Sequence, residues 1–409
     1  MKQRIHEYFQ QNEARITDEL VRLLGEMVRE KTVNVVSEKL AEHPYLKIRG
    51  EEHRVAAIVG REFDEWGIPY DTYSRQEGRP NLIARIGRDV SGDRLFLAGH
   101  MDVVPAGDGW PGDPFEMTVK DGYAYGRGVL DNKGPLVACM LAARVLKEAV
   151  GEESLRGQLQ IAALADEEAT DPDGVDYGIG FLLQEGKVNA TMAIIPDIGE
   201  NMKSIDIAEK GRTVIKITSI GKQAHGSTPE RGVNAVFPMA RLALELEKLE
   251  LEHVPHDQLG HPTLNLGEIH GGAAPNIVPG ECHISLDIRT VPGMTREGLL
   301  AQIDACCERA GGEFKVAVMA STEPHQISPD NAVVRAIQAN GREALGFTPE
   351  PFGMGGGTYA KGLNLAGVIA VGWGPGDDNA FHVANESVEI RQLVDFSRML
   401  CLVAIDLLG

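Results

Sequence analysis

Three acidic residues follow an apolar stretch in the segment IAALADEEAT, residues 161–170: Asp166, Glu167 and Glu168. Adjacent carboxylates repel each other unless a cation lies among them. Carboxylates combined with imidazoles are ligands that zinc, cobalt and manganese accept. The segment therefore indicates a cation site, provided that other parts of the chain bring further ligands to it.

Four other segments offer such ligands. LFLAGHMDVV contains His100 and Asp102, AYGRGVLDNKGP contains Asp131, MAIIPD ends in Asp197, and DNAFHVANESVEI contains His382. His100 and Asp102 are two positions apart, so on a strand they share one face. Each segment alone has an ordinary alternative: a chance surface pair, a helix N-cap, a turn aspartate and an exposed loop histidine, respectively. No single segment identifies a site.

The elements around these residues make the combination meaningful. NLIARIG, RLFLAGH, LQIAALAD and MAII read as strands, and helical patterns alternate with them at residues 16–27, 55–66 and 134–149. Near-continuous apolar strands that alternate with helices predict an α/β sheet covered on both faces. The carboxyl ends of such strands meet in one crevice. We therefore expect the histidines and carboxylates to form one mixed metal cluster.

One carboxylate that bridges two ions would hold them roughly 3.5–4 Å apart. In such a cluster Glu168 can bind a metal ion while Glu167 stays unbound and acts on water. These two different roles would explain why two glutamates are adjacent in the sequence.

The pattern of apolar and polar residues changes near Gly211. From here the predicted order is strand–helix–strand–strand–helix–strand. The four strands are RTVIKITSIG, TLNLGEIHGG, ECHISLDIRT and EFKVAVMA, and the two helices span 233–251 and 297–310. That order fits a small sheet with two helices on one face. After this region the alternation of apolar strands and helices resumes, with a strand at GVIAVGWG and a long helix predicted from Glu386 to the end. We predict a doubly wound, mixed-sheet catalytic domain (1–210 and 325–409) with an inserted α+β, ferredoxin-like domain (211–324).

Composition excludes several classes of partner. The 409 residues carry a formal net charge of −20, which argues against a nucleic acid or an anionic membrane as partner. The N-terminus lacks the apolar core of a signal peptide, and the longest apolar run, residues 136–146, is too short for a bilayer. The five cysteines show no metal-ligand spacing. We expect buried thiols in the reducing cytoplasm.

Eight motifs follow one another in a fixed order over nearly the whole chain. They are GHMDVVP, GRGVLDNKGP, ADEEA, IIPD, GKQAHGSTPERGVNA, PNIVPGECHISLDIR, GGGTYA and FHVANE. In this the sequence resembles the dinuclear zinc exopeptidases and deacylases. That family includes glutamate carboxypeptidase, acetylornithine deacetylase, succinyl-diaminopimelate desuccinylase and bacterial dipeptidases. The resemblance implies two Zn²⁺ ions per subunit, for which Co²⁺ or Mn²⁺ can substitute.

The resemblance also assigns the metal ligands. His100, Asp131 and Asp197 would bind one ion, and Asp131, Glu168 and His382 would bind the other, so that Asp131 is the bridge. In the family the bridging aspartate is followed by a cis peptide bond. Asn132 stands where several relatives have a second aspartate, and we expect no consequence because this position is not a metal ligand.

Three further residues would take part in the reaction. Asp102 would orient His100, and Glu167 would be the general base for a hydroxide that bridges the two zinc ions. Glu167 would then pass the proton to the departing nitrogen. His225 matches a family histidine that reaches the site of the partner subunit and stabilises the oxyanion. The resemblance thus implies a homodimer formed through the inserted domain.

Substrate recognition would use residues near the domain boundary. Asn276 and Arg289 match family positions that hold a substrate carboxylate, a task for which the paired donors of arginine are suited. Gly356, Gly357 and Thr358 resemble a loop whose amide groups also bind substrate. The substrate would be a small peptide or an N-acyl amino acid.

Asp197 divides the family. Dipeptidases and aminopeptidases usually carry aspartate there, whereas carboxypeptidases and deacylases usually carry glutamate, so Asp197 favours a dipeptidase or small-peptide exopeptidase. The length and the compact inserted domain favour an N-acyl-amino-acid deacylase of the acetylornithine deacetylase or succinyl-diaminopimelate desuccinylase type, or a carboxypeptidase. A non-catalytic amino-acid binder is a remote alternative, since it should have lost Glu167 or a ligand.

Overall fold

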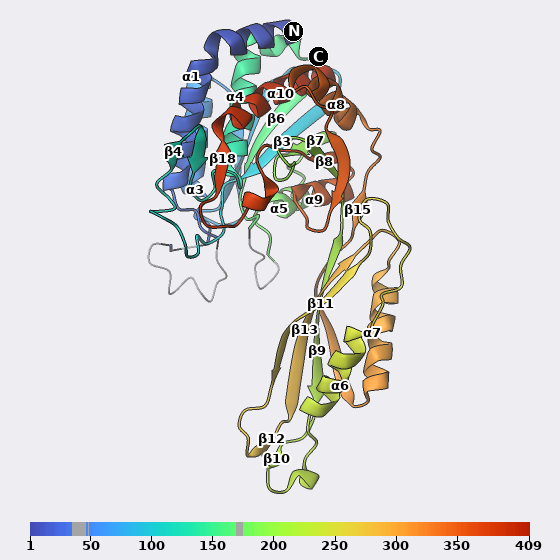
Figure 1. Cartoon of the computed structure of the whole chain (residues 1–409). Coiled ribbons are helices and arrows are strands. Elements are labelled where there is room, and N and C mark those ends of the chain that lie inside the picture. The colour runs from blue at the N-terminus through green and yellow to red at the C-terminus, as the bar shows by residue number, and fades with distance from the viewer. Residues whose placement is uncertain (35–45, 48, 169–174) are drawn as a thin grey trace. The chain divides into compact units, whose positions relative to one another are not determined.

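The structure, a computed structural model, describes residues 1–34, 46–47, 49–168 and 175–409 (Figure 1). The described residues form two compact units. Unit 1 contains Met1–Ile207, Ile327–Phe352 and Thr358–Gly409, and unit 2 contains Ala208–Gln326 and Gly353–Gly357.

The largest sheet, most of whose strands belong to unit 1, is mixed. Its strands run in the order β1-β2-β6-β3-β7-β17-β8, and β15 and β16 also pair with β8. The central strands β6, β3, β7 and β17 are parallel, whereas β1, β2 and β8 are antiparallel to their neighbours. The bounds are β1 Tyr70–Ser74, β2 Pro80–Gly87, β3 Arg94–His100, β6 Gln158–Leu164, β7 Met192–Ile195, β8 Ser204–Glu209, β15 His325–Gln326, β16 Glu350–Met354 and β17 Ile369–Gly372.

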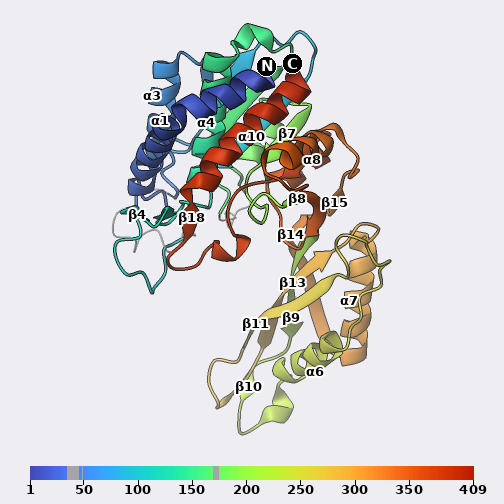
Figure 2. The same cartoon turned by 45° about the horizontal axis from the view of Figure 1, so that its top comes forward.

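Helices cover both faces of this sheet, as the continuous apolar strands predict. Leu95 and Leu97 of β3 pack on the side of α1, α4 and α10, which lie side by side in Figure 2. The alternate residues Phe96 and Ala98 pack on the side of α5 and α9. The helices of unit 1 are α1 Lys2–Arg29, α3 His53–Trp66, α4 Lys133–Ala149, α5 Ile179–Gln184, α8 Ala332–Ala344, α9 Tyr359–Leu365 and α10 Ile390–Leu408, with 3₁₀ turns at Glu152–Ser154 and Asp378–Ala380.

The mixed α/β class is confirmed, but the final helix begins later than predicted. Residues Ser387–Glu389 form strand β18, which pairs with β5 (Tyr123–Tyr125), and β5 pairs in turn with β4 (Thr118–Lys120). Only then does α10 begin. The tertiary pairing with β5 overrides the helical pattern of this short segment.

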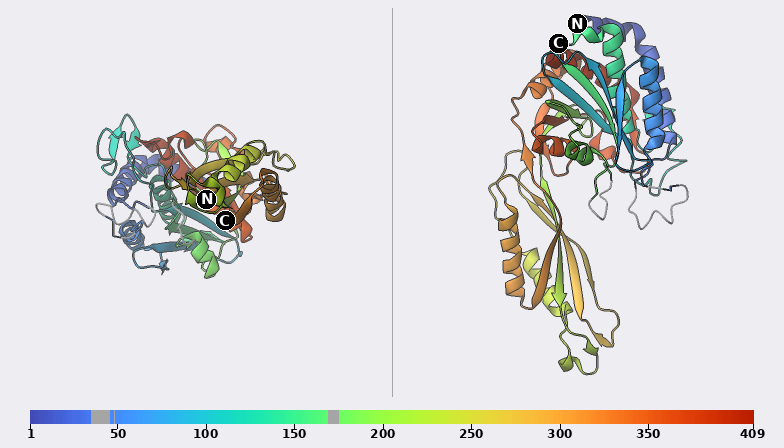
Figure 3. Two further views of the ribbon diagram at one scale, coloured as in Figure 1. Left: turned by 90° about the horizontal axis from the view of Figure 1, so that it is seen from below. Right: turned by 180° about the vertical axis from the view of Figure 1, so that it is seen from behind.

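Unit 2 contains a four-stranded antiparallel sheet in the order β11-β13-β9-β14. Figures 1 and 3 show α6 and α7 on the same face of this sheet. The two central strands, β9 and β13, alternate between buried and half-exposed residues because the helices cover one face of the sheet. Ile215 and Ile217 of β9 pack against Leu242 and Ile303 of the helices. The bounds are β9 Gly211–Ile220, α6 Val236–Glu247, β11 Thr263–Gly271, β13 Glu281–Thr290, α7 Arg296–Ala310 and β14 Glu313–Thr322; β10 Ala224–His225 and β12 Ile277–Val278 form a ribbon, and a 3₁₀ turn spans Pro229–Arg231.

All five cysteines are buried with free thiols. Among the described residues, no helix has both the length and the apolar character that a membrane crossing requires.

Candidate metal centre

The parallel strands of unit 1 bring the predicted metal ligands together at their carboxyl ends. His100 is the last residue of β3, Glu168 follows β6, and Asp197 follows β7. Asp131 lies just before α4, and His382 lies in the loop before β18. The strand-end rule therefore accounts for three of the five positions, and two loops supply the others.

Asp131 lies between the two histidines. Its Oδ1 is 2.9 Å from Nε2 of His100, and its Oδ2 is 2.9 Å from Nε2 of His382. Glu168 Oε2 is 3.1 Å from the same nitrogen of His382, and Asp197 Oδ1 is 3.6 Å from Nε2 of His100. Each oxygen of Asp131 thus faces a different imidazole, as a bridging ligand requires.

These side chains fit a pair of divalent cations. Two groups have ligand atoms that all lie within 4.8 Å of one another: His100 with Asp131 and Glu168, and His100 with Glu167 and Asp197. Among the residues that the structure describes, the buried Oε1 atom of Glu168 has no hydrogen-bond partner, which is costly unless an ion binds it. The mixed imidazole and carboxylate donors are those that zinc, cobalt and manganese accept.

The electrostatics also indicate a site that needs positive charge. Burial, together with repulsion from Asp131, raises the pKa of Glu168 to about 8. Burial and the Asp197 carboxylate raise the pKa of Glu167 well above its usual value. Hydrogen bonds to Asp131 and Glu168 raise the pKa of His382 to about 10. The carboxylates repel each other, and a histidine compensates their negative charge only when its ring is protonated.

Asp102 contacts both His100 and the backbone of the glutamate pair. Its backbone oxygen is 2.9 Å from Nδ1 of His100, and its Oδ1 is 3.4 Å from the same nitrogen. Its carboxylate also accepts the backbone N–H groups of Glu167 and Glu168, at 3.1 and 3.0 Å, and the side-chain amide of Asn34 at 2.7 Å. Asp102 therefore fixes the backbone that carries the glutamate pair.

Asn132 has a role that the sequence interpretation missed. Its Nδ2 donates to Oδ1 of Asp197 at 2.9 Å and to the backbone oxygen of Pro196, also at 2.9 Å. The peptide bond between Asp131 and Asn132 is cis. Asn132 thus contacts Asp197, one of the predicted ligands, and its position beside Asp131 is the signal in the sequence for this contact.

The third acid of the opening segment points into a different environment. Oδ1 of Asp166 accepts hydrogen bonds from Arg49 at 2.8 Å and from Arg79 at 3.0 Å, both buried. Arg79 also binds Glu52 through two nitrogens. Asp166 is thus neutralised by arginines, and only Glu167 and Glu168 remain for the cluster.

The other predicted residues lie mostly in unit 2. His225 ends β10 and Asn276 immediately precedes β12, and next to them the N–H of Gly226 donates to the backbone oxygen of Asn276 at 2.8 Å. Arg289 on β13 binds Asp287 at 2.7 Å and reaches the backbone oxygen of Gly355 at 3.4 Å, so it lies beside the glycine triplet that includes Gly356 and Gly357. Thr358 is in unit 1, where it caps α9 through Ala360.

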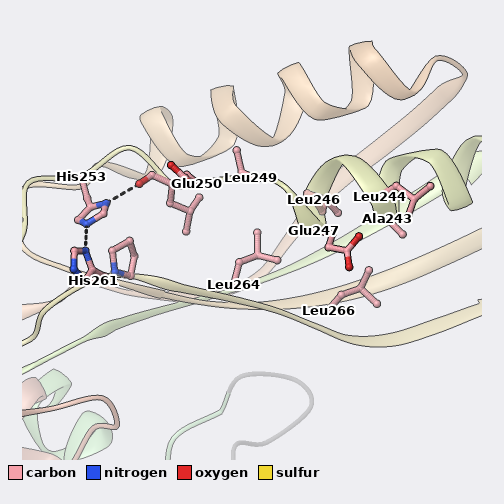
Figure 4. A pocket seen from close by; sticks show the side chains of 12 residues that line it. Ala243, Leu244, Leu246, Glu247, Leu249, Glu250, His253, His261, Leu264 and Leu266 are labelled. Atoms are coloured by element: carbon pink, nitrogen blue, oxygen red, sulfur yellow. Dashed lines mark hydrogen bonds between the residues drawn. The ribbon is translucent and has the colours of Figure 1, made fainter.

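Unit 2 also contains a cavity of about 890 Å³ between α6, the loop that follows it and β11 (Figure 4). Half of the residues that line it are leucines, and ring nitrogens of His253 and His261 meet at one end, 2.7 Å apart. None of the predicted site residues lines this cavity. We therefore do not interpret this cavity as the reaction site, despite its size.

Comparison with known proteins agrees with this centre. The profile of Peptidase family M20/M25/M40 matches residues 96–406. The chain is 32% identical to acetylornithine deacetylase of Myxococcus xanthus over 77% of its length and 80% of the relative. It is 27% identical to the uncharacterized metallohydrolase MJ0457 of Methanocaldococcus jannaschii, over 94% and 98% of the two chains.

The fold is similar to that of the dipeptidase Dug1p from Saccharomyces cerevisiae, with a TM-score of 0.73 at 15% identity over 99% and 98% of the chains. The family match spans most of the chain and includes every residue of the cluster. The chain therefore belongs to Peptidase family M20/M25/M40 and is a metallohydrolase that acts on peptide or other amide bonds.

Proposed function

We propose that the protein hydrolyses dipeptides or other small peptides with a pair of divalent metal ions, zinc in the first place. His100, Asp131 and Asp197 would hold one ion, and Asp131, Glu168 and His382 the other. The observation that carries this proposal is the position of Asp131, each of whose carboxylate oxygens lies 2.9 Å from a different histidine.

When bound, the metal ions supply a water with a pKa lowered to about 7 and polarise the substrate carbonyl. Glu167 would accept the proton of the attacking water and donate it to the departing nitrogen. Two observations support this role. Glu167 lies close to His100 and Asp197, and its backbone N–H donates a hydrogen bond to the carboxylate of Asp102. His225 of the partner subunit would donate a hydrogen bond to the oxyanion.

The substrate would carry a free carboxylate. Arg289 uses its Nε edge to bind Asp287, so its outer edge can pair with a second carboxylate, and Asn276 would supply a neutral donor. The amide groups of Gly356 and Gly357 and the hydroxyl of Thr358 would add further hydrogen bonds to the substrate.

A second candidate is the removal of an N-acyl group from an amino acid. The relatives that are more than 30% identical to the chain include acetylornithine deacetylases, which favours this activity. Asp197 favours peptides, because the resembling dipeptidases carry aspartate at this position. Both activities use the same centre and differ in the group on the acyl side of the scissile bond.

A substrate panel separates the two candidates. The protein is treated with EDTA, reloaded with zinc, cobalt or manganese, and incubated with dipeptides, N-acetyl amino acids and N-succinyl amino acids. We expect no cleavage without metal, restored cleavage with it, and the highest kcat/KM on a dipeptide. A preference for N-acyl amino acids would establish the second candidate, and metal-independent binding without turnover of any substrate would refute both.

A further inference from the structure

We infer that Glu386 and Arg127 form a clamp that positions Asp131 and His382 for metal binding. The inference rests on the proposed metal centre, and neither residue was assigned a role above. Both side chains are almost completely buried, at 0% and 1% exposure, and their charged groups meet at 2.6 Å (Arg127 Nη1 to Glu386 Oε2).

The Glu386 carboxylate holds the loop that carries Asp131. It accepts the backbone N–H groups of Gly128 at 3.1 Å, Leu130 at 2.8 Å and Asp131 itself at 3.1 Å. The last two residues lie more than 250 positions before Glu386 in the chain. Three amide donors around one carboxylate form an anion-binding concavity, which here is filled by the protein itself.

Arg127 makes the reciprocal contact with the loop that carries His382. Its Nη2 donates to the backbone oxygens of His382 at 3.4 Å and Val383 at 3.3 Å, and to that of Ala106 at 3.2 Å. The guanidinium also lies over the ring of Trp110, with 5.4 Å to its centroid. Each loop therefore contributes a charged side chain that binds the backbone of the other.

The backbone of the first loop is shaped for this contact. Gly128 has a φ of +89°, and a Cβ atom there would lie 2.8 Å from Cγ1 of Val103. His382 also has a positive φ, +60°, so its backbone needs support from its surroundings. The carbonyl contact from Arg127 provides such support next to the ligand.

The clamp explains how two ligands on distant segments are held before any ion arrives. Oδ2 of Asp131 lies 2.9 Å from Nε2 of His382. The side chains can come this close because the Glu386–Arg127 ion pair holds the backbones of both loops by hydrogen bonds. Residues that orient metal ligands in this way typically contribute about 10–100-fold to metal affinity. Glu386 and Arg127 are positioning residues and need not touch the substrate.

The test measures how firmly the full-length protein retains cobalt. Cobalt-loaded wild type, Glu386→Gln, Arg127→Met and Arg144→Met are titrated with a chelator, and the visible absorption of bound cobalt is followed. Arg144 is a matched control, since it pairs with Glu19 and lies 5.3 Å from the ring centroid of Trp66, at the other end of α4 from the cluster. We expect the two clamp variants to lose cobalt at about 10–100-fold less chelator, and the control to match the wild type.

A second readout separates positioning from catalysis: at saturating cobalt, kcat of the clamp variants should return towards that of the wild type. Wild-type cobalt retention in Glu386→Gln, or an equal loss in Arg144→Met, would overturn the inference. If Glu386→Gln does not fold, Arg127→Lys decides, because lysine keeps the charge but lacks the planar fork; unchanged retention would then refute the clamp. A wild type that binds no cobalt would instead refute the metal centre itself.

Discussion

Glu167 is the residue on which the chemistry of the centre depends. Its neighbour Glu168 reaches His382, whereas Glu167 lies close to His100 and Asp197 and is not needed to complete either proposed set of ligands. Both glutamates are attached to the same anchor, Asp102, through their backbone N–H groups. A substitution at Glu167 should therefore affect proton transfer more than metal binding.

We predict that Glu167→Gln lowers kcat by about 10²–10⁴-fold, because glutamine has the shape of glutamate but cannot accept a proton. Metal content should stay close to that of the wild type. Steady-state kinetics and metal analysis on the same preparation check both statements. Glu185→Gln, an exposed change at the end of α5, is the control. Unaltered kcat in Glu167→Gln would remove the general base from the mechanism.

At the scale of elements, buried ion pairs connect the segment before α3 to the strand ends. Arg79 binds Glu52 at the start of α3 and Asp166 after β6, and all three side chains are buried. Burial raises the pKa of Glu52 to about 7, although Arg79 opposes this. If Arg79 is removed, the buried carboxylate of Glu52 loses its arginine partner, and Asp166 is left with Arg49.

We predict that Arg79→Met lowers the free energy of unfolding by about 3–5 kcal/mol at neutral pH. Burial raises the pKa of Glu52 from 4.5 to about 7 in the fold, so the stability that protonated Glu52 contributes is lost as the pH rises from 4.5 to about 7. Urea unfolding at several pH values measures this. Arg94→Met, which removes the more exposed pair with Asp89, should cost at most about 1 kcal/mol; an equal cost for both variants would contradict the account.

The sequence predicted the cluster because strand ends can be recognised from apolar runs. His100, Glu168 and Asp197 lie at or shortly after the ends of such runs, whereas Asp131 and His382 were candidates from polar loop segments, and the family resemblance then assigned all five as ligands. The supporting contacts could not be predicted in this way. They depend on tertiary pairing between distant segments, such as the contact of Glu386 with the Asp131 backbone, and on β18, where the sequence predicted only helix.

At the scale of the whole molecule, unit 2 offers a surface for a second copy of the chain. β11 is an edge strand, and large apolar side chains are exposed on it and on α6: Ile269 at 54%, Phe237 at 66% and Leu244 at 56%. An edge strand with apolar neighbours is suited to pairing with another strand. This supports the proposed homodimer through the inserted domain.

We predict that Phe237→Asp combined with Leu244→Asp converts a dimer into a monomer, because charges on this face oppose its burial. Light scattering measures the mass. Activity should fall with dimer content if His225 of the partner subunit completes the site, and His225→Ala should then lower kcat without changing the mass. A wild type that is monomeric and fully active would exclude a contribution from the partner.

The most direct test of the metal centre is an anomalous difference map from a zinc-loaded crystal, recorded at the zinc absorption edge. We expect two peaks in unit 1, roughly 3.5–4 Å apart, with one oxygen of Asp131 bound to each metal ion. A single peak, or two peaks that do not share Asp131, would contradict this expectation.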